Sequence, residues 1–262
     1  MSNTWITIIG FAIISVMTTL GSAVVYLFKG KINDIFRTLF LGFAAGVMIA
    51  ASIWSLILPS IEQAESWGSL SFIPAVIGFL CGGGFLVLID KIVPHIHKSG
   101  DKEEGPKNNL NKTTKLFLAV TIHNIPEGLA VGFAFGGAAL IGTNAAFLSA
   151  LALAIGLGIQ NFPEGAALSL PMEAETKNKH KAFLFGAASG IVEPIAAVIG
   201  FFLATFLVTL QPWLLSFAAG AMIFVVVEDL IPEAKLDEHS HLGTWAVMIG
   251  FVVMMVLDIA LG

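Results

Sequence analysis

Two related segments, HNIPEG at residues 123–128 and QNFPEG at residues 160–165, decide the fold of this chain. Each places an imidazole or amide side chain, an asparagine, a proline and a glutamate in a stretch that is otherwise apolar. An unpaired polar group is costly in an apolar environment, and an unpaired charge is costlier still. The two segments therefore need specific partners wherever the surrounding chain buries them.

The composition is that of a protein that crosses a membrane several times. Of 262 residues, 56% are hydrophobic and 12% are charged, and the mean hydropathy is +0.89, whereas soluble domains carry about 25% charged residues. Eight apolar stretches are long enough to cross about 30 Å of hydrocarbon as helices. They are residues 4–28, 38–59, 72–93, 115–138, 144–170, 182–205, 212–231 and 243–261. We therefore predict an all-α integral membrane protein with eight transmembrane helices. A β-barrel would need shorter segments of alternating hydrophobicity.

Basic residues predict the orientation of the chain. All thirteen Lys and Arg residues fall in or beside the connections after the first, third, fifth and seventh predicted spans. Because Lys and Arg mark the cytoplasmic side, we expect both termini outside the cytoplasm and the polar connection at 99–113 to be a flexible cytoplasmic loop. The net charge of −5 reflects acids inside the spans and does not indicate a nucleic-acid partner. Cys81 is the single cysteine, so a disulfide within the chain is excluded.

A second internal repeat links the second and seventh predicted spans. GFAAGVMI starts at Gly42 and SFAAGAMI starts at Ser216, and a proline follows each at nearly the same distance. In the predicted topology these two spans run in opposite directions, as do the two spans that carry HNIPEG and QNFPEG. Inverted repeats are typical of secondary transporters, whose binding sites lie near the middle of the membrane. Packing faces rich in Gly and Ala could also resemble one another by composition alone.

Acidic residues inside the spans indicate what the polar segments bind. Seven fall within or at the edge of predicted spans: Asp90, Glu127, Glu164, Glu193, Glu228, Asp229 and Asp258. No basic side chain accompanies them at depth. A carboxylate at the bilayer centre costs about 2.5–3.5 kcal/mol even on an insertion scale. Several such groups without basic partners require protons, water or a bound cation, and we favour a cation.

The spacing of the polar residues supports a metal site. In each six-residue segment the first residue and the glutamate lie four positions apart, so they share a helix face, and the asparagine lies beside them. Pro126 and Pro163 are expected to open the helices there, because proline has no N–H to donate, and Glu193 precedes Pro194 in the same way. One imidazole with carboxylate and amide oxygens suits a borderline divalent metal such as Zn²⁺, Mn²⁺, Fe²⁺ or Cd²⁺. Alternatively, these groups only join helices through hydrogen bonds.

The remaining polar residues are open to two interpretations. Asp90 is either an anchor at the membrane interface or part of an ion pathway, and Glu228, Asp229 and Asp258 are candidates for such a pathway. The other histidines fall in predicted cytoplasmic connections and are interpreted as solvated loop residues: His95, His97, His180, His239 and His241.

On HNIPEGLAVG and QNFPEGAALSLP the whole chain resembles the ZIP family of divalent metal transporters, most of all its bacterial GufA-like branch. The resemblance implies a single transmembrane transporter domain, residues 1–262, in the plasma membrane of a bacterium, with both termini outside. It implies transport of zinc, and also of cadmium, iron or manganese, into the cytoplasm by alternating access. No enzymatic activity and no catalytic cofactor are expected. The partners are the metal ions and the lipid bilayer, and a homodimer is left open.

The resemblance also implies a binuclear metal centre at mid-membrane. Its first metal would be held by His123, Glu127, Gln160 and Glu164, and its second by Asn124, Asn161 and Glu193. Glu127 and Glu164 would bridge the two metals, and Met48 matches a position that can add a thioether ligand. Some relatives carry Asp where Asn161 stands, so the second metal is expected either to be held more weakly here or to differ in identity.

The resemblance further implies that the spans form a moving group and a fixed group. Spans one, four, five and six would carry the metal and move against a scaffold of spans two, three, seven and eight. Metal would then leave to the cytoplasm past Asp90, Glu228, Asp229 and Asp258.

Two other functions remain compatible with the residues alone. An intramembrane metallohydrolase could also place His and Glu on membrane helices, with a metal that activates water. A proton-coupled carrier of organic cations could use carboxylates in a membrane cavity, although it would favour aromatic neighbours, and the segments offer mainly Phe133 and Phe162.

The predicted orientation leads to a labelling experiment. A cysteine introduced as Gly142→Cys should react with an impermeant thiol reagent from outside the cell, whereas Asn109→Cys should react only after permeabilisation. The parent chain with Cys81 gives the background. The reverse pattern would overturn both the topology and the inward direction of transport.

Overall fold

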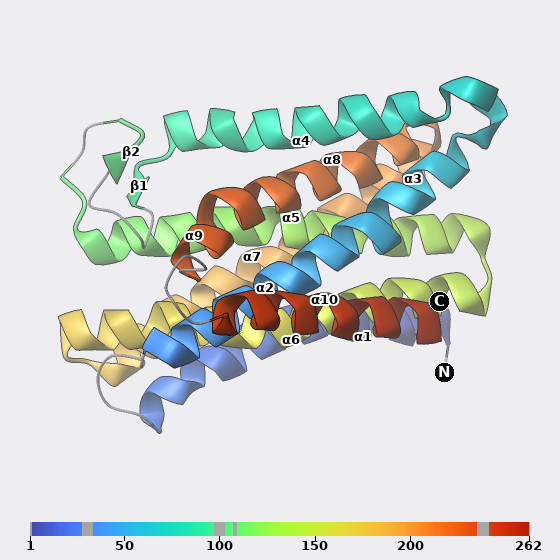
Figure 1. Ribbon diagram of the computed structural model, residues 1–262. Helices are drawn as coiled ribbons and strands as arrows, with labels where there is room; N and C mark the ends of the chain where they lie inside the picture. The colour runs from blue at the N-terminus through green and yellow to red at the C-terminus, as the bar shows by residue number, and fades with distance from the viewer. Residues whose placement is uncertain (1, 28–33, 97–102, 107–108, 235–240, 262) are drawn as a thin grey trace.

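The structure, a computed structural model, describes residues 2–27, 34–96, 103–106, 109–234 and 241–261 (Figure 1). The α-helices in these ranges are α1 Asn3–Ala23, α2 Asp34–Ala51, α3 Leu58–Gln63, α4 Phe72–Ile92, α5 Lys112–Ile141, α6 Asn144–Thr176, α7 Lys179–Phe206, α8 Gln211–Val225, α9 Ile231–Glu233 and α10 Leu242–Leu261. Short 3₁₀ helices occupy Val24–Tyr26, Glu65–Leu70 and Val208–Leu210.

Eight helical segments of the described chain are long and apolar enough to cross a membrane, and they coincide with the eight predicted spans. The observed helices extend beyond several predicted ends; α6, for example, has 33 residues and continues to Thr176. About 20 residues are enough to cross the hydrocarbon, so α6 continues into the polar region. It ends where Lys177 adopts a left-handed conformation with φ of 55°, a common way to stop a helix.

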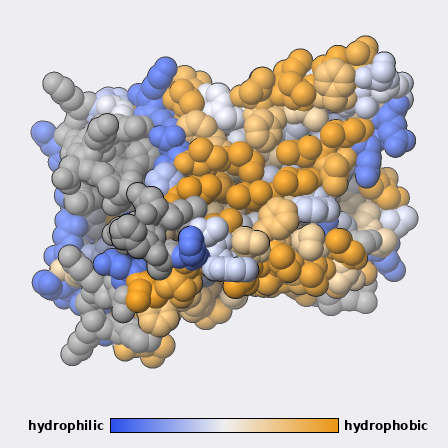
Figure 2. Space-filling view, viewed as in Figure 1, coloured by the Kyte–Doolittle hydropathy of each residue, from blue (hydrophilic) through white to orange (hydrophobic). Residues whose placement is uncertain are grey.

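The surface has the distribution of polarity that a membrane imposes. Figure 2 shows hydrophobic side chains over the middle of the bundle and hydrophilic ones at its two ends. Large apolar side chains are exposed on several helices, among them Leu80, Ile199 and Ile259. The chain is therefore a multi-pass membrane protein. Both termini lie at the same end of the bundle, opposite the strands that follow α4 (Figure 1).

The connection after α4 contains an element that the sequence did not predict. Strand β1, His95–Ile96, pairs antiparallel with β2, Glu103–Glu104. Strand β2 falls within the predicted flexible loop at 99–113, while residues 97–102 and 107–108 lie outside the described chain. The flexibility of the loop stays a prediction.

The long helices pack as two groups. Within the first group α5 packs most extensively against α7, and α1 packs against α6 and α7. Within the second group α2 packs against α10, and α4 packs against α8. Contacts of α2 and α10 with α6, and of α5 with α8, join the two groups. The second group consists of two helix pairs with few direct contacts between them. The division into a metal-carrying bundle and a scaffold therefore stays a prediction.

The inverted repeat is present in the structure. Helices α2 and α8 run in opposite directions (Figure 1), and each leads into a π-helical segment, Ser52–Ile57 or Val226–Leu230. A short helix with proline in its first turn follows in both cases, at Pro59 and Pro232. The π segments are a feature that the sequence analysis missed. Such segments frequently occur at functional sites.

The glycines of the repeated motif allow equivalent helix contacts in the scaffold. A β-carbon at Gly46 of α2 would clash with the backbone of α10 at Val247, and one at Gly220 of α8 would clash with the backbone of α4 at Phe79. Small residues at such positions let membrane helices approach closely. The similarity of the two FAAG segments therefore reflects an equivalent close helix contact as well as a similar composition.

This contact predicts a difference between two glycines. Gly46→Ala should lower the stability of the protein by about 1–3 kcal/mol, because the added methyl group overpacks the contact with α10. Gly84→Ala on α4 should have no such cost, because a β-carbon there has no neighbour within 4 Å. Thermal unfolding in detergent compares the two variants with the parent. Equal midpoints for both variants would show that the close approach does not limit stability.

Candidate metal centre

Helix α5 presents His123, Asn124 and Glu127 toward the interior of the bundle. Glu127 and Asn124 are almost completely buried, and His123 is 14% exposed. The helix continues through Pro126 without a break, as α6 does through Pro163. Neither proline therefore breaks its helix. Proline has no N–H to donate, so the carbonyl oxygens of Ile122 and Ile159 receive no helical bond from these prolines, and their use by an ion stays a prediction.

Hydrogen bonds tie the second motif to α7. On α6, Gln160 Nε2 donates to Asn161 Oδ1, and Asn161 Nδ2 donates to Glu193 Oε2 over 2.8 Å. On α5, Asn124 Nδ2 donates to the carbonyl oxygen of Ser189 over 3.0 Å. The three helices that carry the predicted ligands are thus joined at one depth.

Glu193 has a further partner that the sequence analysis missed. Its Oε1 accepts a hydrogen bond of 2.7 Å from Thr18 Oγ1 on α1. Both residues are fully buried. Thr18 is one of four threonines in α1, and its partner lies 175 residues away in the sequence. The pattern of the chain therefore contains no signal for this contact.

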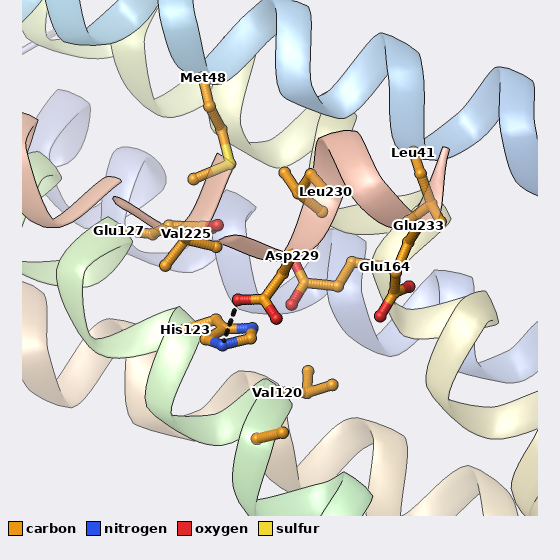
Figure 3. Close-up of a pocket in the computed structure, with 11 residues that line it drawn as sticks. Leu41, Met48, Val120, His123, Glu127, Glu164, Val225, Asp229, Leu230 and Glu233 are labelled. Atoms are coloured by element: carbon orange, nitrogen blue, oxygen red, sulfur yellow. Dashed lines mark ion pairs between the residues drawn. The ribbon is translucent and has the colours of Figure 1, made fainter. Parts of the chain in front are cut away.

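Three of the four predicted ligands of the first metal line a narrow cavity, and Gln160 does not (Figure 3). The volume of the cavity is about 20 Å³, enough for about one water molecule or ion. Met48 of α2 lines it together with His123, Glu127 and Glu164. The remaining lining residues come from the starts of α2 and α5 and from the region of α9: Leu41, Ala119, Val120, Val225, Asp229, Leu230 and Glu233. The cavity therefore extends toward the end of the bundle opposite the termini.

Asp229 contacts the imidazole of the site. His123 Nε2 lies 3.1 Å from Asp229 Oδ2, and Asp229 belongs to the π-helical segment after α8. Glu233, which the sequence analysis also missed, lines the same cavity and lies 3.4 Å from Arg37 Nη2 through its Oε2. Acidic side chains thus follow the cavity from Glu127 and Glu164 toward the end of the bundle opposite the termini.

The other predicted pathway residues lie apart from this cavity. Asp90 and Glu228 line a separate cavity of about 350 Å³ beside the end of α4. Asp258 lies in the last turn of α10, at the end of the bundle that holds the termini, and accepts a hydrogen bond of 2.6 Å from Ser55 Oγ. Grouping Asp258 with the cytoplasmic exit is therefore wrong, because α10 carries it to the opposite end. Its place on a pathway at that end stays a prediction.

The chemistry of the site suits a cation. Asn124 Oδ1 and Glu127 Oε2 are buried and accept no hydrogen bond within the described chain. Two buried oxygens without donors in such a site are costly unless a cation approaches them. Across the described residues, however, no three His, Cys, Asp or Glu side chains are placed to hold a metal by themselves. Amide or thioether ligands, or a movement of helices, would have to complete the coordination.

A second, wider cavity lies at the end that holds the termini. It has a volume of about 240 Å³ and is lined by α3, α5, α6 and α8, with Ser55, Glu62 and Gln211 among its polar residues. None of the predicted metal ligands lines it. No residue lines both this cavity and the one around His123, which lies toward the other end.

Comparison with known proteins identifies the family. The profile of the family described as "ZIP Zinc transporter" matches residues 112–258, more than half of the chain. The chain belongs to the ZIP family. This result confirms the resemblance seen in the two PEG motifs, and it makes the chain a divalent metal transporter whose metal is its substrate.

Named ZIP relatives cover most of the chain. It is 37% identical to "Zinc transporter ZIP11" of Xenopus tropicalis over 94% of both chains. It is 35% identical to "Zinc transporter ZIPB" of Bordetella bronchiseptica over 85% of this chain and 71% of the relative. It is also 32% identical to "Zinc transporter GufA" of Myxococcus xanthus over 80% of this chain and 81% of the relative.

The hydrogen bond between Asn161 and Glu193 generates a stability prediction for this ZIP protein. Asn161→Asp removes the donor and places a second carboxylate beside Glu193. Without divalent metal the variant should be less stable by about 1.5–3 kcal/mol, the usual value of a hydrogen bond to a charged group. Added Zn²⁺ should stabilise it more than the parent, because a cation between two carboxylates binds the folded state. Thermal unfolding with and without Zn²⁺ measures both effects.

Asn178→Asp is the matched control for this change. Asn178 is exposed and caps the start of α7 by accepting from the Lys181 N–H, a role that Asp fills equally well. If Asn161→Asp behaves like Asn178→Asp under both conditions, the bond to Glu193 contributes nothing to the centre.

Proposed function

We propose that this ZIP protein carries Zn²⁺ across the membrane into the cytoplasm through a centre built on α5, α6 and α7. The observation that carries the proposal is the narrow cavity in which His123, Glu127, Glu164 and Met48 meet. The lining acids Asp229 and Glu233 lie on the side of this cavity toward the end of the bundle that holds the predicted cytoplasmic connections. A cation released there would enter the cytoplasm.

The ligand chemistry supports zinc as the cargo. Nitrogen from an imidazole, oxygen from carboxylates and sulfur from a thioether form a mixed set that favours borderline and soft divalent metals over Ca²⁺ or Mg²⁺. Several curated relatives bear the name of zinc transporters. Cd²⁺ suits the same ligands, and Fe²⁺ and Mn²⁺ are further candidates for the carboxylate-rich part of the centre.

Metal binding at the first position would require an exchange of partners. His123 Nε2 faces Asp229, so a metal that binds this nitrogen must displace the carboxylate. Asp229 would then be available as the next oxygen ligand on the way out, and Glu233 would follow it along the cavity. Each step replaces one partner of the cation by another, which keeps the charge compensated in the membrane interior.

A second metal position beside the first is supported by the unpaired oxygens. Asn124 Oδ1 and Glu127 Oε2 lie one turn apart on α5 and have no donor, and Glu193 is joined to Asn161 from the other side. A second cation held by Asn124, Asn161 and Glu193 would share Glu127 and Glu164 with the first. It would have to reorient the amide of Asn161, whose Nδ2 now points at Glu193, so its binding is expected to be the weaker of the two.

Alternating access follows from the two groups of helices. We propose that α1, α5, α6 and α7 move against α2, α4, α8 and α10, and that this structure corresponds to the inward-facing state. Access from the other side would require α5 to separate from α8 near Gly137 and Gln211, where a β-carbon on Gly137 would clash with the amide of Gln211. Extensive packing of α2 with α10 and of α4 with α8 supports movement of each pair as a unit.

The proposal predicts the behaviour of two ligand variants. His123→Ala and Glu127→Ala should each abolish or sharply reduce Zn²⁺ and Cd²⁺ uptake, because ligands act as a set and the loss of one leaves a buried cation with incomplete coordination. Proteoliposomes that contain purified protein measure the uptake of each ion in a panel. Uptake by the parent also separates transport from a hydrolytic function.

Histidines outside the bundle provide the control. The double change His239→Ala with His241→Ala should reduce uptake much less than His123→Ala, although His239 lies outside the described residues. Near-normal uptake by both His123→Ala and Glu127→Ala, at equal amounts of protein, would remove the site from the transport path. Absence of uptake by the parent would refute the proposed function itself.

A further inference from the structure

Thr18 of α1 contacts the metal centre although it belongs to neither motif. Its side chain is fully buried, and its Oγ1 donates to Glu193 Oε1 over 2.7 Å. The same oxygen lies 3.1 Å from the carbonyl oxygen of Ile14 on its own helix. A hydroxyl has one proton to donate, so a bond to Glu193 and a bond to Ile14 exclude each other at any moment.

Close helix contacts fix the position of this hydroxyl. A β-carbon at Gly190 of α7 would lie 2.7 Å from Cβ and 2.9 Å from Cγ2 of Thr18. A β-carbon at Gly165 of α6 would clash with the backbone carbonyl of Thr18. Glycine at both positions lets α1 approach α6 and α7 together. Thr18 is therefore held from two sides, with its hydroxyl facing Glu193.

Glu193 has one donor on each carboxylate oxygen. Thr18 donates to Oε1, and Asn161 donates to Oε2 over 2.8 Å. Each carboxylate oxygen has two lone pairs, so these bonds fix the plane of the carboxylate and leave capacity for a cation. Hydrogen bonds of this kind orient metal ligands and make up much of the affinity of metal sites.

A purely structural hydroxyl on the same helix behaves differently. Ser22 lies one turn from Thr18, is equally buried, and donates to the carbonyl oxygen of Thr18 over 2.9 Å. The hydroxyl of Ser22 is thus satisfied by backbone. The hydroxyl of Thr18 could likewise donate to the carbonyl oxygen of Ile14 on its own helix. It also lies within hydrogen-bond distance of the Glu193 carboxylate on α7.

We infer that Thr18 is a positioning residue that orients the Glu193 carboxylate toward the transported metal. This inference rests on the proposed function, in which Glu193 is a metal ligand. Thr18 itself does not bind the metal. Its removal should therefore weaken metal binding through Glu193 and through no other ligand.

The test compares substitutions that keep or remove the hydroxyl. Thr18→Val preserves the shape of the side chain and should weaken equilibrium binding of the second Zn²⁺, the one held by Glu193, by about 10- to 100-fold in the purified protein. Thr18→Ser keeps the hydroxyl and should bind Zn²⁺ nearly as the parent does. Ser22→Ala, the matched control, should leave the affinity unchanged. Thr18→Ala serves as a second variant without the hydroxyl in case the valine variant does not fold.

A double-mutant cycle with Glu193→Gln separates positioning from packing. If Thr18 acts through Glu193, adding Thr18→Val to Glu193→Gln should cause no further loss of affinity. If the affinity losses of Thr18→Val and Glu193→Gln multiply in the double variant, the inference is overturned, because the hydroxyl then acts elsewhere. An equal affinity loss in Thr18→Ser would also overturn it, because the side chain then acts only through packing. Unchanged Zn²⁺ affinity in both Thr18→Val and Thr18→Ala would also overturn the inference. The proposed function would still stand in that case if Zn²⁺ uptake is lost in His123→Ala.

Discussion

The cost of burying carboxylates in a membrane governs this structure. Glu127, Glu164 and Glu193 lie in the interior of a bundle whose spans carry no basic residue at that depth. Partners must therefore come from hydrogen-bond donors or from a cation. Glu193 receives two donors, from Thr18 and Asn161, whereas one oxygen of Glu127 receives none. The bundle thus holds one acid in place and leaves another able to bind a cation.

Close helix packing brings these acids together. Each PEG motif provides both an acidic side chain and a glycine that allows the close packing. The glutamate of each motif supplies the carboxylate, and the glycine after it removes a side chain where another helix approaches. A β-carbon at Gly128 would clash with the carbonyl of Glu193, and one at Gly165 would clash with the carbonyl of Thr18. Substituting either glycine would push apart the helices that carry the ligands. Ligand chemistry and backbone contact are therefore inseparable in these six-residue segments.

The sequence was sufficient for features that depend on local pattern. Apolar length predicted the eight spans, and the PEG motifs predicted most of the polar residues that the bundle gathers. Features that depend on how helices rotate against one another were not predictable. The contact of His123 with Asp229 and the bond from Thr18 to Glu193 join residues that are remote in the sequence. The π segments are local, but no residue pattern used in the sequence analysis distinguishes them from α-helix. Asp258 was grouped with the exit by the family resemblance, although the predicted topology, with the C-terminus outside, already places it near the outer end of the eighth span.

The two halves of the inverted repeat have similar backbones but different side chains at equivalent positions. This difference affects how a cation is bound at each end of the bundle. Ser55 and Asp229 each lie twelve residues after the phenylalanine of a FAAG motif, both within π segments, yet one is a hydroxyl and the other an acid. Thr18 and Glu193 meet the glycines of the two PEG motifs in the same way, and again only one of them is charged. Equivalent backbones allow two related arrangements of the helices. Unequal side chains give a cation different partners at the two ends, so the two arrangements need not bind it equally.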